Sequence, residues 1–131
     1  MRHDPDAVQK MADAYTVAWC SHDPAQVASF YAPDGSIQIN RGDVLKGTEA
    51  IETMAAAFFA QFPDLVVRCD GVRVAADHVA FLWTLEGSDA NTQNHVKLPG
   101  WEEWTLTDDL KVQTSLGWFD KEDELRQIAG D

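Results

Sequence analysis

The sequence predicts an α+β fold, shaped as a cone with a ligand pocket. Two amphipathic helices open the chain, and a third helix follows a short strand. Four strand-like segments then come in a row, and a short acidic helix closes the chain. Helices beside a run of antiparallel strands form two packed layers. Polar side chains at Tyr15, Asn40 and Glu103, with 5 tryptophans among 131 residues, predict a pocket between those layers.

The first two helices carry matching start signals. Asp4-Pro5 and Asp23-Pro24 each place a capping carboxylate before a proline at the first helical position. The first helix then buries apolar residues at helical spacing, namely Val8, Met11, Ala12, Tyr15 and Trp19. The second helix is expected to turn inward the side chains of Val27, Phe30 and Tyr31.

A short strand and a third helix are expected next. Residues 32–35, Ala-Pro-Asp-Gly, predict a turn, and the alternation over residues 36–40 predicts a strand. Residues 41–43 predict a loop. Thr48 is expected to cap the third helix, which ends at residues 62–64, Phe-Pro-Asp.

The second half of the chain predicts two hairpins and a terminal helix. β-rich runs at 65–74 and 78–86 are joined by a turn, and runs at 101–107 and 112–119 are joined by another. Residues 87–95 predict a polar loop, and residues 121–128 predict the terminal helix.

The same pattern predicts one domain and a dimer. Residues 1–131 are enough for a single domain with one core. The strands carry apolar residues on both faces, and the helices cover only one of them. A second copy of the chain is the simplest cover for the other face, so we expect a homodimer through the sheet.

Charge excludes several kinds of partner. The formal charge is -12 with only 10 Lys and Arg residues, and the pI is about 4.5, which argues against nucleic acids and anionic membranes. The polar N-terminus has no signal-peptide pattern, and no long apolar run occurs, so we expect a cytoplasmic protein. We expect no cofactor and no metal, because the sequence has no glycine-rich phosphate loop and no histidine pair at metal-ligand spacing.

Three parts of the chain resemble the nuclear transport factor 2-like superfamily, and within it the SnoaL-like group. They are residues 21–35, residues 46–51, and residues 100–104 taken with 115–120. The resemblance implies a curved, mostly antiparallel sheet wrapped around a long N-terminal helix, the cone also called cystatin-like. Members include ketosteroid isomerases, limonene epoxide hydrolases, polyketide cyclases, dehydratases and non-catalytic binding proteins. Fold alone therefore does not decide the reaction.

Two residues match positions that ketosteroid isomerases use to hold a developing oxyanion. Tyr15 precedes the helix-opening Asp23 by eight residues, as the isomerase tyrosine does. Glu103 precedes Asp108 of the hairpin turn by five residues, as the protonated acid does. The resemblance implies that both donate hydrogen bonds to a ligand oxygen. The alternation of the strand leaves Glu102 as the alternative inward carboxylate, because it shares a face with Leu98, Trp104 and Leu106.

At other positions where the relatives carry catalytic acids, this chain has none. The isomerase base falls at Ile39, and two acids of limonene epoxide hydrolase fall at Leu85 and Gly117. Asn40 matches the asparagine that holds water in that hydrolase, so we expect it to orient a ligand. His95 ends the polar loop, and histidine is the residue type best suited to proton transfer at physiological pH, so we expect it to move a proton at the pocket mouth.

Large aromatic side chains are expected to line the pocket: Trp19, Phe58, Phe62, Phe81, Trp83, Trp101, Trp104 and Trp118. They are also large enough to fill it. The leading hypothesis is a pocket for a small hydrophobic molecule, with isomerase-, cyclase- or hydrolase-type catalysis. The alternatives are a non-catalytic binding or interaction module, and a structural dimer with a closed core.

Overall fold

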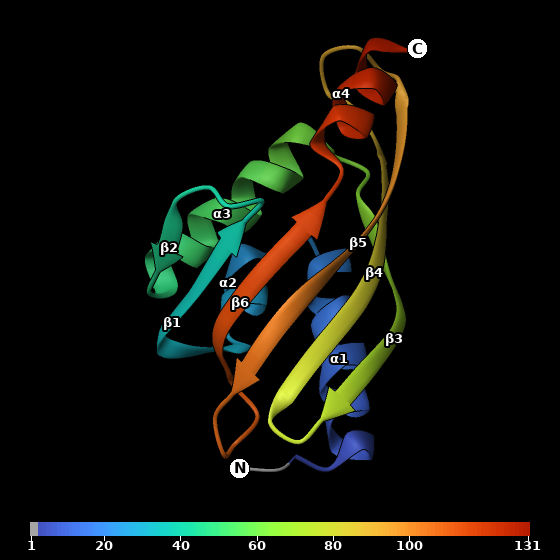
Figure 1. Cartoon of the computed structure of the whole chain (residues 1–131). Helices are drawn as coiled ribbons and strands as arrows, with labels where there is room; N and C mark the ends of the chain where they lie inside the picture. The colour runs from blue at the N-terminus through green and yellow to red at the C-terminus, as the bar shows by residue number, and fades with distance from the viewer. Residues whose placement is uncertain (1–2) are drawn as a thin grey trace.

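A computed structural model describes residues 3–131 and shows one sheet with helices packed on one face (Figure 1). In chain order the elements are α1 (Pro5–Cys20), α2 (Pro24–Ala28), β1 (Tyr31–Ile39), β2 (Val44–Lys46), α3 (Thr48–Gln61), β3 (Val66–Ala75), β4 (His78–Ser88), β5 (His95–Leu106), β6 (Val112–Phe119) and α4 (Lys121–Ala129). The α+β prediction is confirmed.

The sheet has six strands in the order β2-β1-β6-β5-β4-β3. Neighbouring strands run antiparallel, except that β1 pairs in parallel with β6. In Figure 1 the twisted sheet lies in front of α1, α2 and α3. We call the face toward these helices the inner face, and the opposite face the outer face.

Both predicted helix starts are present. The Asp4 side chain accepts a hydrogen bond from the Asp6 amide at 3.4 Å, and Asp23 accepts one from the Ala25 amide at 3.0 Å. These bonds satisfy amide groups that have no partner within the first turn of a helix. The predicted apolar stripe of α1 is buried against the sheet.

The turn predicted at residues 32–35 and the predicted cap of the third helix were wrong, and one short strand was not predicted. Residues 32–35 belong to β1 rather than to a turn, although the register of β1 against β6 shifts between Tyr31 and Ser36. The lack of a side chain at Gly35 allows the two strands to approach closely, because a Cβ atom there would lie only 2.6 Å from the carbonyl oxygen of Val112. The cap of α3 is Gly47, with a φ of 94°, and Thr48 is the first helical residue. Strand β2 was not predicted, because three residues are too few to show a period.

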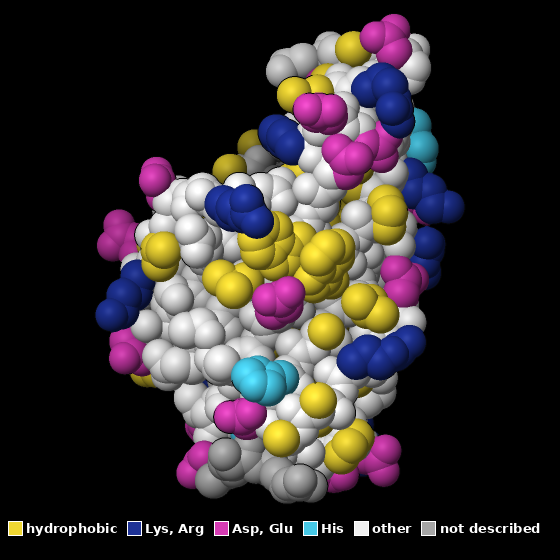
Figure 2. All heavy atoms as spheres, in the orientation of Figure 1, with side chains coloured by type: hydrophobic (Ala, Val, Ile, Leu, Met, Phe, Trp, Pro, Cys, Tyr) yellow, Lys and Arg dark blue, Asp and Glu magenta, His cyan; other side chains and the backbone are white. Residues whose placement is uncertain are grey.

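The outer face of the sheet carries an exposed apolar patch. Hydrophobic side chains gather there over β5 and β6 (Figure 2). Trp101 and Leu116 are 41% and 38% exposed, and the rings of Trp101 and Trp118 lie side by side with centroids 6.4 Å apart.

None of the helices described combines the length and apolar character that crossing a bilayer requires.

Candidate functional site

An apolar cavity of about 50 Å³ lies between the inner face of the sheet and helices α1 and α3. Its aromatic walls are the rings of Trp19, Phe58, Phe81, Trp83 and Phe119. Aliphatic side chains complete most of the rest, namely Ile37, Ile39, Met54, Val67 and Leu85. Glu102 and Gly117 also line it. The lining of the cavity is therefore almost entirely apolar.

Among the described residues that line this cavity, Glu102 has the only ionisable side chain. It is 6% exposed. Strand β5 turns it inward, opposite Phe81 of β4 and opposite Gly117 of β6. The absence of a side chain at Gly117 leaves room beside it, since a Cβ atom there would lie 3.9 Å from Cγ of Glu102. Glu102 is therefore an acidic residue in an otherwise apolar wall.

Hydrogen-bond donors converge on one oxygen of this carboxyl group. Oε1 of Glu102 accepts bonds from Ser115 Oγ at 2.8 Å and from Trp104 Nε1 at 2.9 Å. The Tyr15 hydroxyl lies 3.2 Å from Oε1 and 3.3 Å from Oε2, and the Tyr31 hydroxyl lies 3.4 Å from Oε1. Among the described residues, Oε2 has only the longer Tyr15 contact.

Burial raises the pKa of Glu102, because removal from water disfavours the charged form. The hydrogen bonds from Trp104, Ser115 and the two tyrosines act in the opposite direction and only partly offset this effect. No ion pair joins Glu102 to a basic side chain within residues 3–131. The carboxyl group is thus poised to take up and release a proton closer to neutral pH than a surface glutamate.

Tyr15 holds Glu102 and does not line the cavity. Its hydroxyl is 2.8 Å from that of Tyr31, and both side chains are buried. Burial raises the pKa of both tyrosines, and the charge of Glu102 adds to the effect on Tyr15. The expected contact between Tyr15 and a ligand oxygen is replaced by contacts to Tyr31 and Glu102.

Glu103 does not point into the cavity, and this corrects its predicted inward position. It lies on the outer face, where it accepts a hydrogen bond from Trp101 Nε1 at 3.2 Å. Successive residues of a strand point to opposite faces, so only one of the two glutamates can face inward. The count from the hairpin turn selected Glu103, whereas the alternation with Leu98, Trp104 and Leu106 correctly grouped Glu102 with the inner face.

Asn40 lies outside the cavity wall and closes the end of β1. It has a φ of 50°, and its Oδ1 accepts a hydrogen bond from the Phe119 amide at 3.0 Å. Its own amide donates to the Gly117 carbonyl at 2.9 Å. Asn40 therefore positions two cavity residues of β6 through their backbone, in place of the expected direct contact with a ligand.

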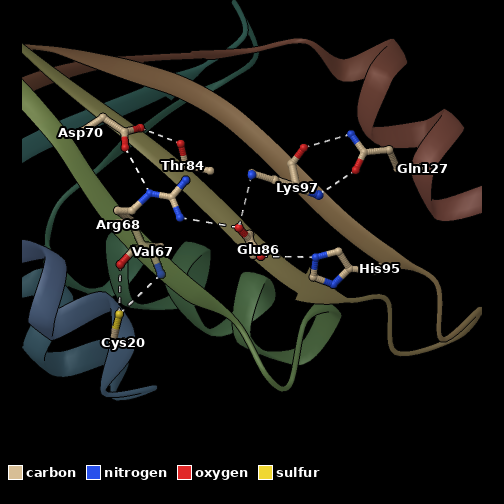
Figure 3. A network of polar contacts seen from close by, with 9 residues as sticks. All are labelled: Cys20, Val67, Arg68, Asp70, Thr84, Glu86, His95, Lys97 and Gln127. Atoms are coloured by element: carbon tan, nitrogen blue, oxygen red, sulfur yellow. Dashed lines mark hydrogen bonds and ion pairs between the residues drawn. The ribbon is translucent and has the colours of Figure 1, made fainter.

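His95 also lies outside the cavity, on the outer face. Its Nε2 is 3.3 Å from Oε2 of Glu86, and its side chain is 62% exposed. Glu86 also pairs with Arg68 and Lys97, and the Gln127 side chain of α4 bonds to the backbone of Lys97 (Figure 3). His95 precedes Glu102 by seven positions on the same strand, and this odd number places their side chains on opposite faces.

The predicted aromatic residues divide into three groups. Trp19, Phe58, Phe81 and Trp83 line the cavity. Phe62 and Trp104 are buried in the core, where Trp104 stacks on Phe81 with centroids 5.0 Å apart. Trp101 and Trp118 lie on the outer face.

Sequence reasoning missed several functional positions. Ser115 and Phe119 were not singled out, although they alternate with Gly117 on the inner face of β6. Tyr31 was expected to face inward, but its pairing with Tyr15 depends on the irregular start of β1. The three acid-free positions, Ile39, Leu85 and Gly117, all line the cavity. No group of His, Cys, Asp or Glu side chains within residues 3–131 is arranged to hold a metal ion.

Comparisons with known proteins agree with this architecture. A family model described as "SnoaL-like domain" matches residues 4–113. No curated protein matches the chain.

Solved structures similar to this chain share its fold. A Catenulispora acidiphila protein with a ketosteroid isomerase-like fold, in complex with trimethylamine, has a TM-score of 0.84 at 19% identity and covers 92% of each chain. A proposed SnoaL-like polyketide cyclase from Jannaschia sp. has a TM-score of 0.77 at 18% identity, over 98% of this chain and 99% of that one. AclR of Streptomyces galilaeus, a proposed hydroxylase, has a TM-score of 0.81 at 15% identity, over 98% and 99%.

Proposed function

The chain belongs to the SnoaL-like domain family, and on this basis we propose that its cavity binds a small hydrophobic molecule with which Glu102 exchanges a proton. One observation carries this proposal: a buried carboxyl group with a raised pKa lines an otherwise apolar cavity. Proton transfer is most efficient when the pKa of the catalytic group lies near the working pH, and burial raises the pKa of Glu102 toward that range.

Isomerisation is the reaction type that this cavity supports best. A single carboxyl group can remove a proton from one carbon and return it to another, so an isomerase needs no second acid in the cavity. Hydrolase and cyclase chemistry usually divides the roles of acid and base between two groups. The cavity positions that carry acids in relatives are Ile39, Leu85 and Gly117 here.

Two similar structures support the class of ligand. The Catenulispora protein is in complex with trimethylamine, a small molecule whose surface consists mostly of methyl groups. The Jannaschia protein is a proposed polyketide cyclase, and polyketides carry ketone groups. A small ketone with exchangeable protons is therefore the first substrate class to test.

Deuterium exchange tests this proposal. Native mass spectrometry first selects ligands from a pool of small ketones, epoxides and lactones. Selected ketones are then incubated with the protein in D₂O, and deuterium uptake beside the carbonyl group is followed by NMR. The wild-type protein is expected to accelerate uptake, and Glu102→Gln to lose about 100-fold or more of that acceleration.

Glu103→Gln is the matched control, because it removes the same charge from the outer face of the same strand. This variant is expected to exchange like the wild type. Equal losses in both variants would contradict the assignment of proton transfer to Glu102.

A non-catalytic binding role is the second candidate function. It is favoured by the apolar residues at the positions where relatives carry acids. Ligands that bind with one copy per subunit, but exchange no faster than in buffer, would support binding alone over catalysis.

We also infer that a second copy of the chain covers the outer face. Trp101 and Leu116 expose apolar surface on this face, and the rings of Trp101 and Trp118 lie side by side. Figure 2 shows hydrophobic side chains gathered there. Contiguous apolar surface of this kind commonly marks an association site. A twofold pairing would bring the same patch of each copy together.

A further inference from the structure

One tryptophan of the cavity wall, Trp83, has an indole N–H without a hydrogen-bond partner among the described residues. Nε1 of Trp83 is buried and makes no hydrogen bond to any of the described residues. Buried polar groups are nearly always paired, because an unpaired N–H loses its bonds to water without compensation. The same indole ring lines the cavity.

The position of this ring is fixed by packing against β5. Trp83 lies opposite Gly100, and a Cβ atom at Gly100 would lie 2.4 Å from Cζ2 and 2.5 Å from Cη2 of the indole. Only a glycine lets the ring lie directly on the neighbouring backbone. The ring of Phe119 contacts it edge-on, with centroids 6.2 Å apart.

Trp83 and Glu102 form a pair of polar groups on the inner face. Glu102 is two residues beyond Gly100 on β5, and its partner on β4 is Phe81. The two side chains therefore occupy diagonal positions on adjacent strands, and such neighbours lie within reach of long side chains. Both line the same cavity, whose other lining side chains among the described residues are apolar or absent, as at Gly117.

We propose that Trp83 Nε1–H donates a hydrogen bond to the ligand, so that the cavity selects small apolar molecules with a neutral acceptor oxygen, such as ketones and ethers. This inference rests on the proposed binding role of the cavity. An acceptor oxygen satisfies the unpaired indole N–H, whereas a hydrocarbon of the same shape leaves it unpaired. Selection of this kind follows from the cost of an unmatched buried donor.

A pair of probes with nearly the same shape tests the inference, namely cyclopentanone and methylenecyclopentane. The full chain is labelled with ¹⁵N, and the indole N–H signals of its 5 tryptophans are followed during titration with each probe. The Trp83 signal is identified by its loss in Trp83→Phe. Cyclopentanone is expected to move the Trp83 proton downfield, and methylenecyclopentane is expected to leave it without such a shift.

Affinities in the variants give a second measurement. The ratio of the two probe affinities is expected to fall about fivefold in Trp83→Phe, the size expected for one hydrogen bond. Trp118→Phe is the matched control, because Trp118 Nε1 is also buried without a described partner but its ring lies on the outer face. That variant is expected to keep the wild-type ratio.

The outcomes separate this inference from the proposed function. If both probes bind with equal affinity and the Trp83 proton does not move, the donor role is overturned while the cavity remains a binding site. If neither probe binds, the binding role fails and the inference fails with it. The wild-type spectra decide between these outcomes even if Trp83→Phe does not fold.

Discussion

Glu102 experiences two opposing effects, and their balance sets the pH at which it ionises. Burial favours the neutral acid, and donors such as Ser115 and Tyr15 favour the carboxylate. Because the pKa is raised on balance, the folded state holds this proton more tightly than the unfolded chain, whose glutamates titrate at about 4.3. The resulting stability is present in full below that pH and is lost as the pH rises through the folded pKa.

Tyr15→Phe tests this balance. The change removes a donor to the carboxylate, so the pKa of Glu102 is expected to rise further, and the pH-dependent loss of stability is expected to move to higher pH. The lost hydrogen bond is expected to lower the free energy of unfolding by about 1 kcal/mol. NMR titration of the ¹³C-labelled carboxyl carbon measures the pKa, and urea unfolding across the same pH range measures stability.

Tyr31→Phe serves as the comparison, because its hydroxyl lies farther from Glu102, at 3.4 Å. A smaller rise in the Glu102 pKa is expected there. A fall in the pKa in Tyr15→Phe would show that its hydroxyl does not act as a donor to the carboxylate.

At the scale of elements, β5 separates a cavity from an outer surface through its two-residue period. Glu102 and Trp104 point inward, while Trp101 and Glu103 point outward. Gly100 interrupts the inward series and makes space for the Trp83 ring of β4. The strand therefore contributes the Glu102 carboxyl group and, at Gly100, the space that the Trp83 ring occupies.

Gly100→Ala is expected to destabilise the protein, because the new methyl group would overlap the indole ring and the carbonyl oxygen of Trp118, at 2.6 Å. Overpacking of this kind typically costs about 1–3 kcal/mol. Gly117→Ala is the control, since its nearest neighbour would be Cγ1 of Ile39 at 3.6 Å, an ordinary contact. Urea unfolding should show a clear loss of stability for Gly100→Ala and a small change for Gly117→Ala. Equal losses of stability would contradict the close packing of the Trp83 ring against Gly100.

The order of the elements could be predicted from the sequence because its signals are local. Capping residues and periodicity identify helices and strands without knowledge of their neighbours. The site could be predicted only in part. Trp19 and Trp83 line the cavity, whereas the faces of Glu103 and His95 depend on strand register, which is set by pairing between distant segments.

At the scale of the whole molecule, charge and apolar surface have opposite effects on association. Each copy carries a formal charge of -12, so two copies repel each other. The outer-face patch favours association because pairing removes its apolar surface from water. Salt screens the repulsion between the two copies and leaves the free energy gained by burying the patch nearly unchanged. Higher ionic strength is therefore expected to favour a dimer.

Leu116→Asp is expected to shift the protein toward the monomer, because it places a charge in the patch. Sedimentation equilibrium measures this against the monomer mass of 14.6 kDa. Val17→Asp is the matched control, since Val17 is 68% exposed on α1, away from the outer face. A wild-type chain that stays monomeric at micromolar concentration and high salt would rule out the dimer.

The parallel pairing of β1 with β6 has a consequence for how the chain is made. Strand β1 meets its partner only much later in the chain, since Ile37 pairs with Ser115, 78 positions further on. While the ribosome is still synthesising β6, the edge of β1 that will receive it stays open, and the cavity lacks the wall formed by Gly117 and Phe119. Contacts between such distant segments slow folding. Completion of the sheet and creation of the cavity are therefore a single late event, reached only when the last strand has left the ribosome.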